Sequence, residues 1–511
     1  MSAISCLPVE ILCNIFKFSL TESRRPKSCT NFSQVSQHWR SSALSAPELW
    51  TNIPLNYSRW AQEMLIRSKK ANLTIRSYAS LEVKDPRTIE TVRSCLYEMN
   101  RVEEIDFASI PGQTLEEIFR DCPKSAPQLH TLCISSSGTA FSIHDDFLYD
   151  TELLRHVQLI NCKISWDTPL LTDLTRLKLQ LEDSLNAKFS IIQVLHALQR
   201  MPALTDLYLG DSIRDDSEGL STYVVVDLPC LRVLDISSSV SALTAVLRHI
   251  TFPSSATLSL NCTENQSALT KISNFLFVLS TKFLSTLVIR SLSLRITYSD
   301  YNYYDLKFYL WTTALQDCFP ISQISQSRLQ LGLKLATSQP HNHVKVLTCA
   351  LDAMSLSFLT QLQISTIRDV ESQALVNTFG KLPLLERVCV QNSSPSPFLE
   401  ALVHKTKAAE KSEAAYFDVS FPKLRYIHLE DIDFYRTLID TLLDCFIERY
   451  ERNAEVQVLR LDNCVGLSSI EVERLKEVVV DVIWDGLEQY PFFGNCLESD
   501  SDDDSDAPLT T

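Results

Sequence analysis

Residues with the chemistry for catalysis are sparse in this 511-residue chain. Its nine glycines form no G-x-G-x-x-G, G-x-x-x-x-G-K or G-x-S-x-G pattern. Phosphate-cradling loops and nucleophile elbows need glycine for the close approach of the backbone. The sequence therefore predicts no enzyme, and we expect neither catalytic residues nor a cofactor.

The spacing of candidate metal ligands gives equally weak evidence for a metal site. His341 and His343 stand two residues apart in a polar stretch and could share a metal ion, but no third ligand stands nearby in the sequence. We therefore expect no metal site.

The fifteen cysteines are an odd number and include no C-x-x-C pair. No secretory apolar segment follows Met1, and no apolar run reaches the roughly eighteen residues that a membrane span needs. These features favour reduced thiols in the cytosol or the nucleus and no membrane contact.

The acidic tail offers a possible modification site. Ser499 and Ser501 each precede an aspartate by three residues, which suits acid-directed kinases, although short acidic tracts match this pattern by chance. The tail over residues 496–511 has the composition of a disordered segment.

The elements that could position a binding surface lie at the N-terminus. Ile11, Leu12, Ile15 and Phe16 recur at helical spacing, and Pro8 and Glu10 suit a helix N-terminus. A second predicted helix carries Phe32, Val35, Trp39 and Ala43, and a third short turn starts at Ser45, ahead of Leu49 and Trp50.

About fifty residues are too few for a self-sufficient core. The large apolar side chains of this stretch either bury themselves on one another and on the domain behind, or they bind a foreign chain. The residues alone leave both readings open.

The pattern LPxEIL–IF, then V-S-x-x-W-R, then P-x-L-W-x-x-I, resembles an F-box. Arg40 and Ile53 complete the matching positions. The usual Asp-Leu opening of the second helix is absent, with Cys29 and Phe32 at the apolar positions, and the Glu22–Lys27 loop lengthens the first gap. The resemblance implies docking onto the Skp-type adaptor of a cullin-RING ubiquitin ligase. The adaptor-binding residues that it implies are Leu7, Pro8, Glu10, Ile11, Leu12, Ile15, Phe16, Val35, Trp39, Leu49 and Trp50.

From about residue 100 an apolar triplet recurs, with two residues and then one residue between its members. Its eleven copies are Val102/Ile105/Phe107, Leu129/Leu132/Ile134, Leu154/Val157/Leu159, Leu174/Leu177/Leu179, Leu204/Leu207/Leu209, Leu231/Leu234/Ile236, Leu284/Leu287/Ile289, Leu359/Leu362/Ile364, Leu385/Val388/Val390, Leu424/Ile427/Leu429 and Val456/Leu459/Leu461. Weakened copies stand at Leu258/Leu260 and Leu333/Leu335, and the two longest gaps would hold about two and three repeats.

Two apolar residues two apart point to one face of a strand, and stacked units of this kind share a continuous core. Apolar helical stretches lie between the strands. The array resembles a leucine-rich repeat solenoid, so we predict an α/β fold with parallel inner strands and outer helices. Cys162 and Cys464 take the slot after the last apolar residue, where we expect buried small residues at repeat corners.

Residues between the apolar strand positions are expected to point away from the core, and a subset of them is our hypothesis for target binding. They carry mixed charge, which favours protein recognition over a polyanion. They include Glu104, Asp106, Arg176, Lys178, Asp206, Tyr208, Asp235, Arg290, Arg387, His428, Glu430, Arg460 and Asp462.

The stretch over residues 469–489 is predicted to be a terminal helix or helix–strand unit whose Ile470, Val478 and Trp484 cover the last repeat. With the V-x-W-D-G-like residues 482–486, the whole chain resembles the large F-box families of mushroom-forming fungi.

The net charge of −15 argues against nucleic acid as a partner.

The predicted organisation is an F-box over 1–55, a linker helix and first strand over 56–100, and repeats over 101–465. A cap over 466–495 and the tail over 496–511 follow. We predict a ligase substrate receptor that binds a Skp-type adaptor, through it a cullin, and an unknown target protein. The alternative is a repeat scaffold outside any ligase.

Overall fold

The computed structural model describes residues 7–22, 31–77, 86–181, 188–214, 225–263, 269–299, 303–315, 331–337, 342–365, 370–392, 394–403, 419–434 and 436–488. Two compact units contain them. The first comprises Met1–Leu292, Ile296–Thr313 and Pro320–Leu356, and the second comprises Ser293–Arg295, Ala314–Phe319 and Ser357–Thr511. The predicted repeat array of residues 101–465 runs through both units. Cys29, His341, Ser499 and Ser501 lie outside the described residues.

The first unit begins with helices α1 (Val9–Glu22), α3 (Gln37–Ser45), η2 (Pro47–Trp50) and α4 (Ser58–Arg67). The second predicted helix starts later than its apolar spacing indicated. The Ser36 side chain accepts a hydrogen bond from the backbone N–H of Trp39 and caps α3 there, so Phe32 and Val35 precede this helix.

A large, mostly parallel sheet follows in the first unit, and each strand pairs with the next in a parallel ladder. Its successive strands are β1 (Asn52–Pro54), β2 (Leu73–Arg76), β3 (Val102–Pro111), β4 (Thr131–Ser137), β6 (His156–Ile160), β8 (Arg176–Gln180), β9 (Asp206–Gly210), β11 (Val233–Ser238) and β13 (Thr257–Cys262). The apolar pairs lie in register: Leu177 and Leu179 face Leu207 and Leu209, and all four are buried.

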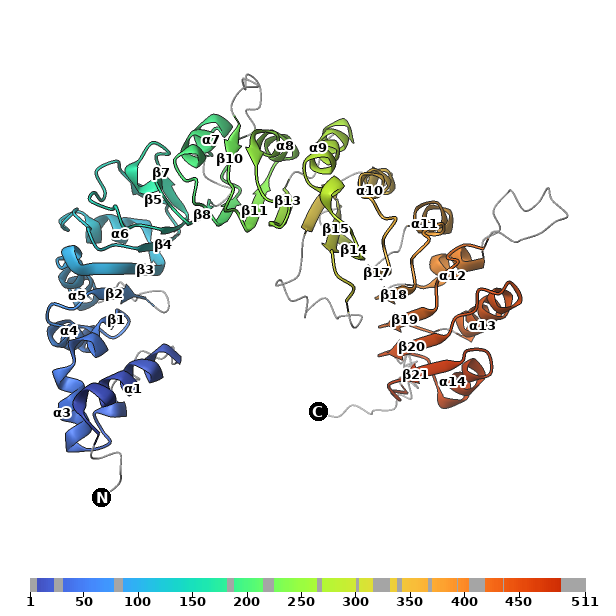
Figure 1. Cartoon of the computed structure of the whole chain (residues 1–511), viewed down its shortest axis with the longest axis horizontal. Helices are drawn as coiled ribbons and strands as arrows, with labels where there is room; N and C mark the ends of the chain where they lie inside the picture. Colours follow the sequence, from blue (N-terminus) through green and yellow to red (C-terminus); the bar gives the residue numbers. More distant parts are fainter. Residues whose placement is uncertain are drawn as a thin grey trace, which may run out of the picture. The chain divides into compact units, whose positions relative to one another are not determined.

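Helices connect these strands, and in Figure 1 α7, α8 and α9 lie together on one side of β8, β11 and β13. The helices are α5 (Pro86–Leu96), α6 (Gly112–Phe119), α7 (Ile191–Gln199), α8 (Val240–His249), α9 (Leu269–Lys282) and α10 (Asn342–Asp352), with 3-10 turns η3 (Met99–Arg101), η4 (Pro169–Leu171) and η5 (Leu284–Thr286). Two short parallel pairs accompany them, β5 (Phe141–Ile143) with β7 (Cys162–Ile164) and β10 (Val226–Asp227) with β12 (Ile250–Thr251). The core of this unit lies between strands and helices, because a strand face of apolar pairs must be covered.

The sequential order of strands ends after β13. Its next neighbour is β16 (Leu331–Thr337), and β15 (Tyr303–Trp311) then runs antiparallel to β16. The predicted triplet Leu284/Leu287/Ile289 is wrong as a strand, because it lies on η5 and the segment after it, and β14 (Ser291–Ser299) begins later. Only three residues separate β14 from β15, which is too few for the crossover helix that a parallel repeat requires.

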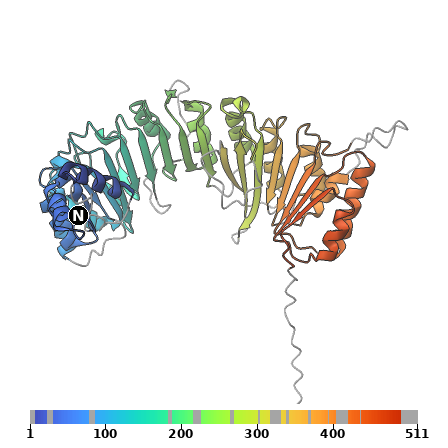
Figure 2. The same cartoon turned by 60° about the horizontal axis from the view of Figure 1, so that its bottom comes forward.

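The second unit repeats the parallel arrangement with β17 (Gln361–Ser365), β18 (Arg387–Gln391), β19 (Tyr426–Glu430), β20 (Val458–Asp462) and β21 (Asp481–Trp484). Figure 2 shows these strands side by side within the unit. The described helices between them are α11 (Ser372–Phe379), α12 (Ser396–Val403), α13 (Arg436–Glu451) and α14 (Ser469–Lys476).

Corners after several strands use residues that tolerate a left-handed backbone. Asn161, Asn392 and Asn463 have φ of 53°, 52° and 50°, a region in which asparagine is far commoner than branched residues. Next to them, Cys162 and Cys464 are buried, and their thiols donate to backbone carbonyls of the strand before. The prediction of buried small residues at these corners is confirmed.

The end of the second unit is a helix–strand unit, α14 followed by β21. The Ser468 side chain and Glu471 form a capping box at the start of α14. The predicted covering residue Ile470 is wrong, because its side chain is 73% exposed. Val472, Leu475 and Val479 form the buried face instead, and the predicted Val478 and Trp484 are half-buried.

Candidate functional site

Helix α1 has two apolar faces with opposite surroundings. Leu12 and Phe16, four residues apart, are fully buried. Ile11, Ile15 and Phe18 follow one another at spacings of four and three on another side of the helix, with exposed fractions of 46%, 42% and 75%. We name these three residues the apolar stripe. Exposed apolar clusters commonly mark a surface that binds another molecule.

The inner face of α1 is held by aromatic packing. The Phe16 ring stacks on Phe32 at 4.4 Å and lies 5.1 Å from the ring of Trp39. At the start of the helix, Nε2 of His38 lies 3.2 Å from the carbonyl oxygen of Leu7. These contacts fix the helix against α3 and leave the apolar stripe directed away from the core.

Trp50 joins the helices to the sheet. Its indole N–H donates to the carbonyl of Ala43 at 2.8 Å, its ring makes a T-shaped contact with Trp60, and the Arg67 guanidinium lies 4.5 Å above it. Immediately after η2, Ile53 of β1 pairs with Ile75 of β2. The core of the N-terminal helices is therefore continuous with that of the sheet.

The predicted adaptor-binding residues divide by exposure. Pro8, Glu10, Ile11, Ile15 and Val35 are exposed, Leu7 and Trp39 are half-buried, and Leu12, Phe16, Leu49 and Trp50 are buried. The last four would have to leave the core to contact a partner. Sequence analysis did not single out Phe18, although its spacing from Ile11 and Ile15 on one helix could have revealed it.

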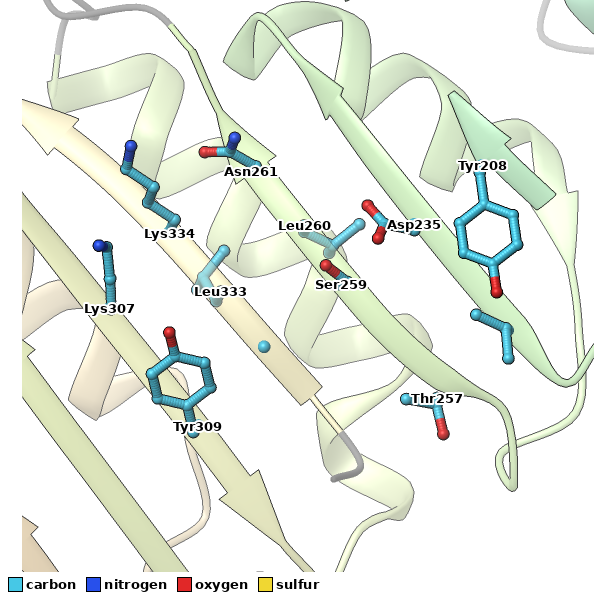
Figure 3. Close-up of a pocket in the computed structure, with 12 residues that line it drawn as sticks. Tyr208, Asp235, Thr257, Ser259, Leu260, Asn261, Lys307, Tyr309, Leu333 and Lys334 are labelled. Atoms are coloured by element: carbon cyan, nitrogen blue, oxygen red, sulfur yellow. The ribbon is translucent and has the colours of Figure 1, made fainter. Parts of the chain in front are cut away.

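A second candidate site is a hollow of about 390 Å³ on the strand face of the first unit (Figure 3). The hollow lies over one row of residues that runs across the sheet. The successive ladder partners in this row are Tyr208, Asp235, Ser259, Gly332 and Tyr309. The small residues at the centre make the floor, and the two tyrosines stand at its sides. The hollow therefore follows directly from the register of five strands.

The hollow has a basic end and an acidic end. Lys307 and Lys334 are direct partners across β15 and β16, and Lys334 forms an ion pair with Asp305 at 3.2 Å. On the other side of the hollow, burial raises the pKa of the Asp235 carboxyl and of the Tyr208 phenol. Figure 3 shows the two lysines together and Asp235 beside Tyr208. Such a lining suits a peptide segment of mixed charge.

The other predicted face residues lie on strands, except Arg290, which lies in the segment between η5 and β14, and several form ion pairs. Arg76 contacts Glu104 at 2.8 Å and Arg176 contacts Asp206 at 3.2 Å. His428 differs, because it is only 2% exposed although it lies on the face opposite the apolar pairs.

Of the predicted histidine pair, His343 is buried with its ring stacked on Tyr304. Sequence analysis did not connect a group of three residues whose ligand atoms lie close enough for one metal ion: Cys389, His428 and Glu430.

The eleven described cysteines form no disulfide with one another. None of the described helices combines the length and apolarity needed to cross a bilayer.

These observations define an α/β protein in which a helical unit with an exposed apolar stripe precedes a large sheet with a polar face. Residues 4–55 match the F-box-like family and form its domain in this chain. The match ends beside Pro54, the last residue of β1. F-box domains generally bind Skp-type adaptors. No curated protein matches the chain.

Proposed function

We propose that the chain is the substrate-receptor subunit of a cullin-RING ubiquitin ligase. The observation that carries this proposal is the apolar stripe of Ile11, Ile15 and Phe18 within the F-box-like domain of residues 4–55. The adaptor would cover the stripe, together with Pro8 and Val35, and would connect the chain to a cullin. Large apolar side chains removed from water contribute roughly 1.5–3 kcal/mol each.

The remainder of the chain would act as a degenerate leucine-rich repeat array. The in-register apolar pairs of consecutive parallel strands, with helices between them, support this assignment. The antiparallel β15 and β16 make it irregular. The resemblance to the F-box families of mushroom-forming fungi stays a prediction, as does a location in the cytosol or nucleus.

The proposed receptor makes and breaks no bonds itself. It would hold a target close to a ubiquitin-loaded enzyme that another subunit recruits, and it would act by raising the effective concentration of the target. We propose that the hollow beside Tyr309 receives part of the target, because tyrosines and paired charges there offer both contact area and specificity.

The alternative is a scaffold in which the N-terminal helices only cover the first strand. The burial of Trp50 against α4 favours this reading, since it ties the helices to the sheet. The exposure of Ile11 favours the receptor, because a pure cap would not need an apolar outer face.

Reconstitution separates the two readings. The full chain is mixed with a purified Skp-type adaptor and then with a cullin, and calorimetry and size-exclusion chromatography follow complex formation. A receptor forms a complex of all three proteins. A scaffold leaves the adaptor unbound, and that result would overturn the proposed function.

A double variant tests the start of α1. Leu7→Ala with Pro8→Ala should weaken adaptor binding about tenfold, because two apolar contacts are lost. Thermal unfolding should stay close to that of the wild type, since neither side chain is fully buried. Co-purification of adaptor at wild-type yield would refute the assignment of these two residues.

A variant of the hollow tests target binding. Lys334→Glu with Tyr309→Ala should reduce target retention by at least about tenfold and leave adaptor affinity unchanged, because the hollow lies outside residues 4–55. Quantitative mass spectrometry of proteins retained from a source lysate provides the measurement. Phe277→Ala, at a 66% exposed position of α9, is the matched control. Equal retention by the variant and the control would exclude the hollow as the target site.

A further inference from the structure

Three metal-ligating side chains meet on the strand face of the second unit. Cys389 lies on β18, and His428 and Glu430 lie on β19. Cys389 and His428 are direct ladder partners, and Glu430 follows two residues later on the same face. Their candidate donor atoms all lie within 4.8 Å of one another. Cys389 and His428 are 1% and 2% exposed, and Glu430 is half-buried.

The histidine is oriented by a carboxylate. Its Nε2 lies 2.9 Å from Oδ2 of Asp462 on β20, and the Arg460 guanidinium contacts the same oxygen at 2.6 Å. The other ring nitrogen, Nδ1, lies 3.5 Å from Sγ of Cys389. A histidine that ligates a metal commonly gives its second N–H to such a carboxylate, which fixes the ring and raises its basicity.

The distances suit a particular ion. Tetrahedral zinc with Zn–S of about 2.3 Å and Zn–N of about 2.0–2.1 Å places sulfur and nitrogen about 3.5 Å apart. The separation of Sγ and Nδ1 has this value before any side chain moves. A thiolate and an imidazole with a carboxylate favour zinc over magnesium or calcium, which prefer oxygen ligands alone.

We propose that Cys389, His428 and Glu430 bind a zinc ion, with Asp462 as the residue that positions His428. The ion joins β18 to β19 and, through Asp462, to β20. A water molecule completes the tetrahedron. Structural zinc sites usually have four protein ligands, so a site with three and a water differs from them, and the role proposed for the ion is to link the strands.

Metal content tests the proposal on the full chain, expressed without a histidine tag in zinc-supplemented medium. Elemental mass spectrometry should find one zinc per chain, and Cys389→Ser and Glu430→Gln should lose most of it. The control is Cys464→Ser in the same unit, whose thiol contacts only backbone carbonyls and whose pKa burial raises to about 12. This control should keep its zinc.

The spectrum of the cobalt-loaded wild-type chain identifies the ligands without requiring any variant to fold. The wild-type chain, stripped with a chelator and loaded with Co²⁺, should show a sulfur-to-cobalt charge-transfer band and the visible bands of a tetrahedral site. Asp462→Asn should keep the bands and weaken zinc binding about 10- to 100-fold, as expected for a group that orients a ligand. A wild-type chain that takes up neither ion, or a Cys389→Ser variant that retains full zinc, would overturn the proposal and indicate that the three side chains only hydrogen-bond to one another.

Discussion

Replacing Ile15 with aspartate should weaken binding of a Skp-type adaptor at least about 100-fold, or roughly 2.7 kcal/mol. Ile15 lies at the centre of the apolar stripe, between Ile11 and Phe18. In the free chain the aspartate would remain in water, because the wild-type side chain is 42% exposed. In the complex it would lose that water without gaining a partner, and an unpaired buried charge is among the most costly substitutions.

Ile66→Asp is the matched control for this experiment. Ile66 lies on α4 in the same unit, is 72% exposed, and receives the same chemical change. Its affinity for the adaptor should stay within about threefold of the wild type, within the range of ordinary surface changes. Calorimetry measures both affinities, and thermal unfolding checks that both variants fold. If Ile15→Asp binds as tightly as Ile66→Asp, the stripe is not the adaptor surface.

The second large effect concerns stability. Arg449 on α13 is fully buried, and its guanidinium donates to the carbonyl oxygens of Leu402, Ser420 and Phe421 at 3.3, 2.9 and 3.0 Å. Burial lowers the pKa of this guanidinium to about 10, so it remains charged at neutral pH. Arg449→Met should lower the free energy of unfolding by about 3–5 kcal/mol, because three buried acceptors lose their donor.

Lys423→Met provides the comparison for Arg449→Met. Lys423 is exposed in the segment before β19, so the same replacement of a cation by methionine should change stability by less than about 0.5 kcal/mol. Urea unfolding followed by circular dichroism gives both values. Equal unfolding midpoints for the two variants would show that the carbonyl contacts of Arg449 contribute nothing to the fold.

Much of the strand layout could be predicted from sequence because a strand has a period of two. Leu177 and Leu179 mark β8, and the weakened pair Leu258/Leu260 marks β13. The prediction failed at Leu284/Leu287/Ile289, because apolar spacing alone cannot distinguish a 3-10 turn from the start of a strand. The antiparallel pairing of β15 with β16 depends on connections, not on the pattern within either strand.

The candidate sites also divide into features that follow from local pattern and features that follow from long-range pairing. Because hydrophobic spacing is a local property, the order of residues already indicates that large apolar residues gather in the first fifty positions. Apolar spacing does not show which of these residues are exposed. Phe16 stacks on Phe32 and is buried, whereas Phe18 is exposed.

Which polar residues meet depends on the pairing of strands that are far apart in the chain. Cys389 and His428 are separated by 39 positions and become neighbours because β18 and β19 pair in register. In the same way, Gly332 forms the floor of the hollow only because β16 lies between β13 and β15. Local patterns specify the strands and their faces, but the order of strands in a sheet is set by long-range pairing and by the connections between them.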